Sequence, residues 1–228
     1  MKNPYSSFRL RFLYGHALIF LGLIFCAPLI FPHVLESESP PVILAFGDSL
    51  TAGYGVQERE SYPARLQDIL RKHGYPHRVI NAGVSGDTTA GGVRRIRWLL
   101  QHDPRVVILA LGANDGLRGL SVTEMYDNLK QIIELCREHR ARVLLAGMKI
   151  PPNYGEAYSR AFEEVYTTLA GEFDLPLLPF ILEGVAAKRE YTQPDGIHPL
   201  GPGYEIVADT VWKYIEPMIA KSPSANNG

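Results

Sequence analysis

The sequence has only two cysteines among its 228 residues, Cys26 and Cys136. Two cysteines cannot form a disulfide framework, and they cannot supply the four ligands of the usual cysteine-based zinc site. Cys26 lies in an apolar N-terminal stretch and Cys136 in a predicted helix, so we expect no disulfide between them. The folded part is therefore expected to need no covalent cross-link.

The sequence also has no excess of positive or negative charge. The 23 Lys and Arg residues are balanced by 24 Asp and Glu residues, for a net charge of -1. This balance disfavours nonspecific nucleic-acid binding, so we expect no nucleic-acid partner. The sequence contains no P-loop, no G-x-G-x-x-G and no H-E-x-x-H pattern, and we expect neither a metal ion nor an organic cofactor.

The N-terminus combines a basic head with a long apolar run. Lys2, Arg9 and Arg11 precede an almost uninterrupted apolar stretch at residues 12–35, a pattern typical of export signals. The run is longer than the roughly 7–15 apolar residues of most signal peptides and close to the roughly 20 that span a bilayer. No clear A-x-A cleavage site follows it. A cleaved signal and a retained inner-membrane anchor both remain open; each predicts an exported, periplasmic protein, and the second predicts membrane association through residues 12–35.

The rest of the chain reads as one domain. Residues 36–41 contain two serines and two prolines and are expected to form a linker, the domain is expected at residues 42–220, and residues 221–228 form a polar tail. Apolar runs predict strands, and apolar residues at helical spacing predict helices. The expected strands are residues 42–46, 78–81, 106–111, 142–146 and 175–178, and the expected helices are residues 62–73, 94–100, 122–139, 158–173 and 203–220.

Alternating strands and helices predict the fold class. Strands that are apolar on both faces are typical of a parallel sheet covered by helices on both sides. We therefore expect an α/β, three-layer αβα fold with a flavodoxin-like parallel sheet of about five strands. Active sites in such sheets lie at the carboxyl ends of the strands.

Four short motifs lie at or after expected strand ends or near the C-terminus. They are Gly47-Asp48-Ser49-Leu50, the Gly83 segment, Gly112-Ala113-Asn114-Asp115 and Asp195-Gly196-Ile197-His198. Each one alone is typical of a turn or a helix cap, and we expect Asp48 and Asp115 to organise their own turns by local hydrogen bonds. Together and in this order, they predict an active site.

This set of motifs resembles the SGNH hydrolases, also called GDSL esterases and lipases, over nearly all of residues 41–220. The resemblance implies that Ser49 is the nucleophile, His198 its general base and Asp195 the group that orients the histidine. Serine needs such a base at neutral pH. It also implies an oxyanion hole made by the backbone amides of Ser49 and Gly83 and the side-chain amide of Asn114.

Further stretches are similar to one branch of that family, the bacterial periplasmic multifunctional acyl-thioesterases, arylesterases and lysophospholipases. They include Leu117-Arg118-Gly119 and Asn153-Tyr154-Gly155. This likeness implies hydrolysis of acyl esters, thioesters or lysophospholipids through an acyl-serine. Four further side chains are candidates for binding substrate, with aromatic packing at the surface as the alternative: Tyr54, Asn153, Tyr154 and Tyr158.

Two other functions stay open. A carbohydrate O-acetylesterase of the same family shares the triad but accepts only acetyl groups. A flavodoxin-like binding domain shares the sheet, predicts bound flavin and has no need of His198. An α/β-hydrolase is excluded, because Gly83-Val84-Ser85-Gly86 does not complete a G-x-S-x-G elbow.

Overall fold

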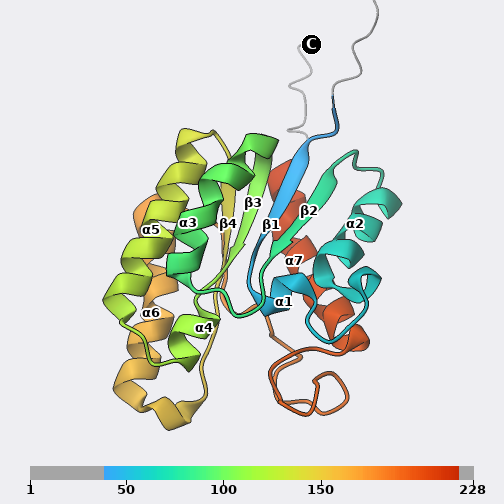
Figure 1. Ribbon diagram of the computed structural model, residues 1–228. Coiled ribbons are helices and arrows are strands. Elements are labelled where there is room, and N and C mark those ends of the chain that lie inside the picture. Colours follow the sequence, from blue (N-terminus) through green and yellow to red (C-terminus); the bar gives the residue numbers. More distant parts are fainter. Residues whose placement is uncertain (1–38, 221–228) are drawn as a thin grey trace, which may run out of the picture. The chain divides into compact units, whose positions relative to one another are not determined.

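A five-stranded parallel β-sheet lies at the centre of the structure, a computed structural model that describes residues 39–220 (Figure 1). The strands are β1 (Val42–Gly47), β2 (Arg78–Gly83), β3 (Pro104–Ala110), β4 (Arg142–Ala146) and β5 (Leu177–Leu178). Their order across the sheet is β2-β1-β3-β4-β5, and every neighbouring pair is parallel. The prediction of a three-layer α/β fold with about five parallel strands is confirmed.

Helices cover both faces of the sheet (Figure 1). One face carries α2 (Tyr62–Lys72) and α7 (Gly201–Ile219), and the other carries α3 (Thr89–Leu99), α5 (Val122–Glu138) and α6 (Glu156–Phe173). Two short helices, α1 (Ser49–Ala52) and α4 (Ala113–Leu117), follow β1 and β3 directly. Three single-turn 3-10 helices, η1 (Glu58–Glu60), η2 (Leu100–His102) and η3 (Pro152–Tyr154), complete the described elements.

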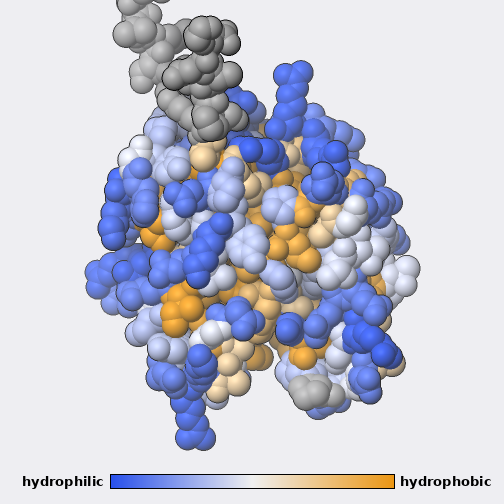
Figure 2. Space-filling model, turned by 180° about the vertical axis from the view of Figure 1, so that it is seen from behind, coloured by the Kyte–Doolittle hydropathy of each residue, from blue (hydrophilic) through white to orange (hydrophobic). Residues whose placement is uncertain are grey.

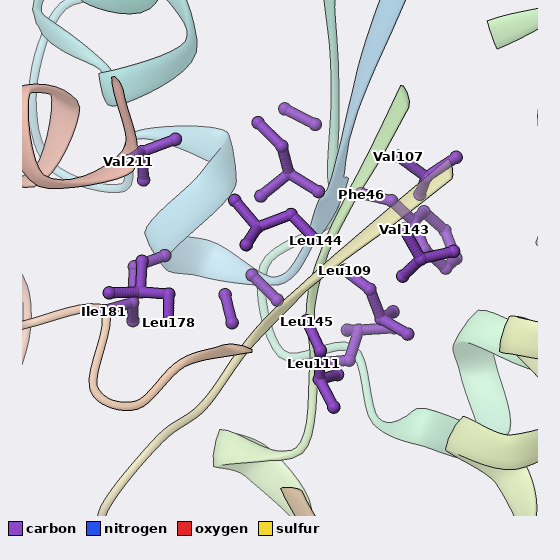
Figure 3. Close-up of a cluster of buried hydrophobic side chains, with 14 of the residues drawn as sticks. Phe46, Val107, Leu109, Leu111, Val143, Leu144, Leu145, Leu178, Ile181 and Val211 are labelled. Carbon is purple, nitrogen blue, oxygen red and sulfur yellow. The ribbon is translucent and has the colours of Figure 1, made fainter. Parts of the chain in front are cut away.

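The core forms where the helices cover the strands. All six residues of β1 are buried, as are all but one residue each of β3 and β4. Figure 3 shows Phe46, Leu109 and Leu145 from these three strands within one cluster. Burying such side chains stabilises the fold by about 1.5–3 kcal/mol each, which explains why the strands are apolar on both faces.

The structure differs from the expected elements at α3. This helix begins at Thr89, five residues before the expected start, because the Thr88 side chain caps it by accepting a hydrogen bond from the Gly91 amide. The helix also includes Gly92, where a Cβ would lie 2.5 Å from Leu111 Cδ1. Glycines between two elements are typical of a loop, but Gly92 serves close packing of a helix. The short helices α1 and α4 were not expected, and β5 has only two residues.

The expected export segment and polar tail lie outside the described residues, as do residues 36–38 of the expected linker. Their assignments stay predictions. Between residues 39 and 220, none of the helices combines the length and the apolar character needed to cross a bilayer.

Sheet order determines where a site can form. From β1 the chain crosses to β2 on one side and afterwards to β3 on the other, so the direction of winding reverses between β1 and β3. In a doubly wound sheet, this reversal opens a crevice at the carboxyl ends of the two strands. The segments that leave β1 and β3 are those of Ser49 and Asn114.

Candidate active site

Ser49 is the first residue of α1, directly after β1. The preceding residue, Asp48, is the N-cap, and its carboxylate accepts a hydrogen bond from the Leu50 amide at 3.0 Å. This cap turns the chain sharply from the strand into the helix and presents the Ser49 side chain at the sheet edge. The Ser49 Oγ lies 2.8 Å from His198 Nε2.

His198 and Asp195 come from the loop between β5 and α7. The His198 Nδ1 lies 2.6 Å from one carboxylate oxygen of Asp195, while the other oxygen accepts hydrogen bonds from the backbone amides of Ile197 and His198. Partial burial raises the pKa of Asp195, but these hydrogen bonds outweigh it and hold the pKa below its usual value. Asp195 therefore stays ionised and can hold a proton on Nδ1, leaving Nε2 free to accept one from Ser49.

Gln193 anchors this loop beside Ser49, a role that the sequence did not predict. Its side-chain amide donates to the carbonyl oxygens of Tyr54 at 2.8 Å and Pro199 at 3.1 Å, and its backbone amide donates to the His198 carbonyl. Gln193 thus links the histidine loop to the segment after α1. No local pattern indicated this, because the contact joins residues 139 positions apart.

The three expected oxyanion donors lie at neighbouring strand ends. The Ser49 amide opens a helix, where the first amides have no helical acceptor. The Asn114 side-chain amide donates at 2.9 Å to the Asp87 carbonyl and more weakly, at 3.3 Å, to Asp48. Its second, weaker hydrogen bond is the one that an oxyanion could replace.

Gly83 occupies a more crowded position than we expected. Its amide donates at 3.0 Å to the Asn81 side chain, so it would have to exchange that acceptor for an oxyanion. A Cβ at Gly83 would lie 2.1 Å from the Ala52 amide nitrogen in α1. A glycine is therefore required here by the close approach of the α1 backbone.

The two aspartates of the motifs behave differently. Asp48 makes the expected local hydrogen bond, and its burial raises its pKa to about 6, although the Leu50 amide and the charge of His198 oppose the shift. The expectation for Asp115 is wrong. Its carboxylate accepts hydrogen bonds from the backbone amide and hydroxyl of Thr89, 26 residues away, and so ties α4 to the start of α3.

Arg95 of α3 connects the segments around the site, and it too was missed. Its guanidinium donates to the Gly47 carbonyl at 2.8 Å, to the Ala82 carbonyl at 2.7 Å and to the Asp87 carboxylate at 2.7 Å. Gly47 and Ala82 are the residues before Asp48 and Gly83. One side chain therefore holds the ends of β1 and β2 and the loop after β2 in fixed positions.

An apolar hollow of about 320 Å³ opens beside Asn114 and His198. Hydrophobic side chains gather in the notch at the lower edge of the domain in Figure 2. The hollow adjoins the site, because Ala113 in its wall precedes Asn114, and Ile197 precedes His198. Its lining comes from α4 and from the segments after β4 and β5: Ala113, Leu117, Met148, Lys149, Ile150, Pro151, Phe180, Leu182, Ala186, Ala187, Gly196 and Ile197.

The four expected substrate-binding residues are not brought together in this hollow. The Tyr54 ring is half exposed and lies 4.7 Å from the His198 ring. Tyr154 and Tyr158 donate hydrogen bonds to the carbonyls of Leu117 and Leu120, so they support the segment after α4, and Asn153 is exposed. The lining at residues 148–151, which was not predicted, follows the end of β4, and the apolar residues after that strand were its signal in the sequence.

Among residues 39–220, no group of three or more His, Cys, Asp or Glu side chains is arranged to hold a metal ion.

Comparison with known proteins identifies the family. The model of the GDSL-like lipase/acylhydrolase family matches residues 45–206. The chain is 42% identical over 185 residues to thioesterase 1/protease 1/lysophospholipase L1 of Escherichia coli, covering 81% of this chain and 88% of that protein. It is 38% identical over 185 residues to esterase TesA of Pseudomonas aeruginosa, covering 81% of this chain and 92% of that protein. A crystal structure of TesA superposes with a TM-score of 0.76 at 40% identity, covering 78% of this chain and 99% of that one.

The chain therefore belongs to the GDSL-like lipase/acylhydrolase family. The resemblance drawn from the four motifs is confirmed, and so is the expectation that the protein is a hydrolytic enzyme.

Proposed function

We propose that this protein hydrolyses acyl esters and thioesters, lysophospholipids among them, through an acyl-serine intermediate on Ser49. The observation that carries the proposal is the hydrogen-bonded series from Ser49 through His198 to Asp195, at 2.8 and 2.6 Å, beside an apolar hollow. The names of the relatives support this range of substrates.

In the first half of the reaction, Ser49 Oγ attacks the carbonyl carbon while His198 Nε2 takes the hydroxyl proton. Asp195 stabilises the positively charged imidazolium that forms. The tetrahedral intermediate carries negative charge on the former carbonyl oxygen, and the amides of Ser49, Gly83 and Asn114 are the proposed donors. When the carbon–oxygen or carbon–sulfur bond breaks, His198 returns the proton to the leaving alcohol or thiol. Water then repeats the sequence to release the acid.

The size of the hollow favours acyl chains longer than acetyl. A group the size of a water molecule occupies about 30 Å³, so 320 Å³ accommodates on the order of ten carbon-sized groups. Its lining is almost entirely apolar, apart from Lys149. An enzyme restricted to sugar acetates has no use for such a volume, and this argues against the O-acetylesterase alternative.

The cellular location is part of the proposal. The basic head and apolar run at residues 12–35 support export to the periplasm, with membrane association through that run if it is retained.

The test is hydrolysis of a p-nitrophenyl ester series from acetyl to palmitoyl by wild type, Ser49→Ala and Asn114→Ala. We expect Ser49→Ala to lose nearly all turnover and Asn114→Ala to lose about 100- to 1,000-fold in kcat with unchanged folding. Ser159→Ala is the matched control, since its hydroxyl in α6 has no hydrogen-bond partner among the described residues.

Three results would contradict the proposal. Near wild-type turnover by Ser49→Ala would show that Ser49 is not the nucleophile. Turnover of acetyl esters alone would indicate the O-acetylesterase. No turnover by a folded protein that binds flavin would indicate the binding domain.

A further inference from the structure

The end of the sheet opposite the candidate active site is basic. At this end the strands begin and the long helices finish, so β1 enters and α7 leaves the domain there (Figure 1). Nine Lys and Arg residues and five Asp and Glu residues give it a net charge of +4, whereas the other described residues, with ten and seventeen, carry −7. We call this end the basic pole and define it as residues 71–78, 97–105, 137–142, 172–176 and 213–220.

The cations of the basic pole are available for a partner. All nine are exposed. Of these, Arg71 alone forms an ion pair within residues 39–220, with Asp68 at 3.2 Å. Arg78, Arg105 and Arg142 stand at the starts of β2, β3 and β4, so they form a row across the sheet edge. Burial lowers the pKa of His77, and the nearby charge of Arg142 lowers it further.

Helix stabilisation explains only part of this charge. Cations in the last turn of a helix interact favourably with its dipole. This accounts for four of the nine cations: Arg71, Lys72, Arg97 and Arg137. The three arginines at strand starts have no such role. Arg140 follows α5 with a φ of 60°, in the left-handed region that favours glycine. The chain therefore has a cation at a position where glycine would relieve backbone strain.

Two apolar features accompany the cations. Trp98 is 64% exposed and lies within the basic pole at the end of α3. Exposed tryptophan is enriched where proteins meet the headgroup layer of a bilayer. A hollow of about 520 Å³ combines Arg137, Arg142 and Lys213 with apolar residues such as Phe173, Leu175 and Met218.

We propose that the basic pole binds the surface of a bilayer that contains anionic phospholipids. Positive charge complements the lipid phosphates, and the indole ring of Trp98 suits the interface. The chain also joins residues 1–38, with their basic head and apolar run, at this end. The active site, at the opposite end of the sheet, then faces away from the bilayer and receives substrate from the aqueous phase.

The test uses the fragment of residues 39–228, which lacks the apolar run. We expect this fragment to fold alone. The crystal structure of TesA matches only 78% of this chain, and that part corresponds to 99% of the TesA chain. Its cosedimentation is measured with vesicles of equal parts phosphatidylglycerol and phosphatidylcholine, and with phosphatidylcholine alone. We expect binding to the anionic vesicles only, with loss at about 1 M salt, where the Debye length is about 3 Å.

Charge variants distinguish an effect of the basic pole on vesicle binding from an effect of net charge. Each cation near an anionic surface contributes about fivefold to the partition coefficient, so the triple change of Arg78, Arg105 and Arg142 to Gln is expected to weaken binding roughly 100-fold. The control changes Arg59, Arg160 and Arg189 to Gln; these are exposed cations outside the basic pole, and the net charge changes equally. Ester hydrolysis, unchanged in both, shows that each variant is folded.

Two further measurements address individual residues. Arg140→Gly is expected to raise Tm by relieving the left-handed strain and yet to weaken vesicle binding about fivefold. Trp98→Phe is expected to abolish the blue shift of tryptophan emission on binding, leaving only the signal of Trp212. Absence of binding to anionic vesicles, equal losses in the two triple variants, or salt-insensitive binding would overturn the proposal.

Discussion

At the scale of single residues, Arg95 is a side chain outside the four motifs that connects three segments around the candidate site. Its guanidinium donates to Gly47, Ala82 and Asp87, and the Asp87 carbonyl in turn accepts from Asn114. A lysine has a single ammonium group and cannot reproduce this planar set of donors.

We therefore predict that Arg95→Lys lowers kcat about 10- to 100-fold, because small displacements of reacting groups are costly. Loss of the hydrogen bonds should also lower the free energy of unfolding by about 1–3 kcal/mol. Steady-state kinetics and urea unfolding measure the two effects. Arg94→Lys is the control, since this neighbouring arginine is exposed. Equal kinetics for the two variants would show that Arg95 does not position the site.

The buried carboxyl group of Asp48 makes stability depend on pH. Burial raises its pKa from 3.8 to about 6 in the folded protein, so the folded state holds a proton that the unfolded state has already released. Stability from this group is complete below about pH 4 and is lost as the pH rises through about 6.

Comparison with Asp48→Asn isolates this effect, because asparagine does not titrate and other groups cancel. The free energy of unfolding of wild type minus that of the variant should fall by on the order of 3 kcal/mol between about pH 4 and pH 7. Urea unfolding across that range provides the measurement. A difference that stays constant or rises with pH would mean that Asp48 is ionised throughout.

At the scale of secondary-structure elements, α3 and α6 offer a matched pair of helical glycines. A Cβ at Gly92 would lie 2.5 Å from Leu111 Cδ1 and 3.1 Å from Ile132 Cδ1, both in the core, whereas a Cβ at Gly171 meets nothing within 4 Å. Alanine favours the helix at both positions by about 1 kcal/mol.

Gly171→Ala should therefore stabilise the protein by about 0.5–1 kcal/mol. Gly92→Ala should destabilise it by about 1–3 kcal/mol through overpacking against Leu111, just after β3, and Ile132 of α5. Thermal unfolding of both variants provides the comparison. Stabilisation by Gly92→Ala would mean that α3 can move away from the sheet at little cost.

The same elements show what sequence patterns miss. Strands β1 and β3 were predicted nearly to their ends because burial on both faces requires continuous apolar runs. The start of α3 was not predicted, because glycines at positions 91 and 92 indicate a loop unless the packing partners are known. Helices α1 and α4 have four and five residues, too few for a helical period to appear.

At the scale of the whole molecule, Cys136 reports on cooperative opening of the fold. It is fully buried in α5, and burial raises the pKa of its thiol to about 12. Thiol reagents attack the thiolate, so the native protein should be nearly inert at neutral pH. In the fragment of residues 39–228, where Cys136 is the single cysteine, we predict that one equivalent reacts with a thiol reagent in denaturant and almost none without it.

The rate of Cys136 labelling at denaturant concentrations below the unfolding midpoint gives the free energy of the opening that exposes α5. A close match to the global free energy of unfolding would show that α5 is released only when the sheet unfolds. Fast labelling in native buffer would instead show that α5 opens alone.

Much of this protein follows from its sequence alone. Apolar strands alternating with amphipathic helices predicted the layered parallel sheet, and the motifs around Ser49, Gly83, Asn114 and His198 predicted the edge at which chemistry is expected. The layered sheet and the gathering of these motifs at one edge could be predicted because they need only local information. A strand buried on two faces is apolar throughout, and parallel strands place their carboxyl ends at one edge.

The tertiary structure decided the rest. Ser49 and His198 lie 149 positions apart, and Gln193 brings their segments together by a hydrogen bond to Tyr54. The contacts of Asp115 and Arg95, the lining of the apolar hollow and the charge of the basic pole likewise depend on which strands are neighbours and how the helices cross between them. Periodicity along the chain does not encode these contacts, because they join segments that are distant in sequence and adjacent only after folding.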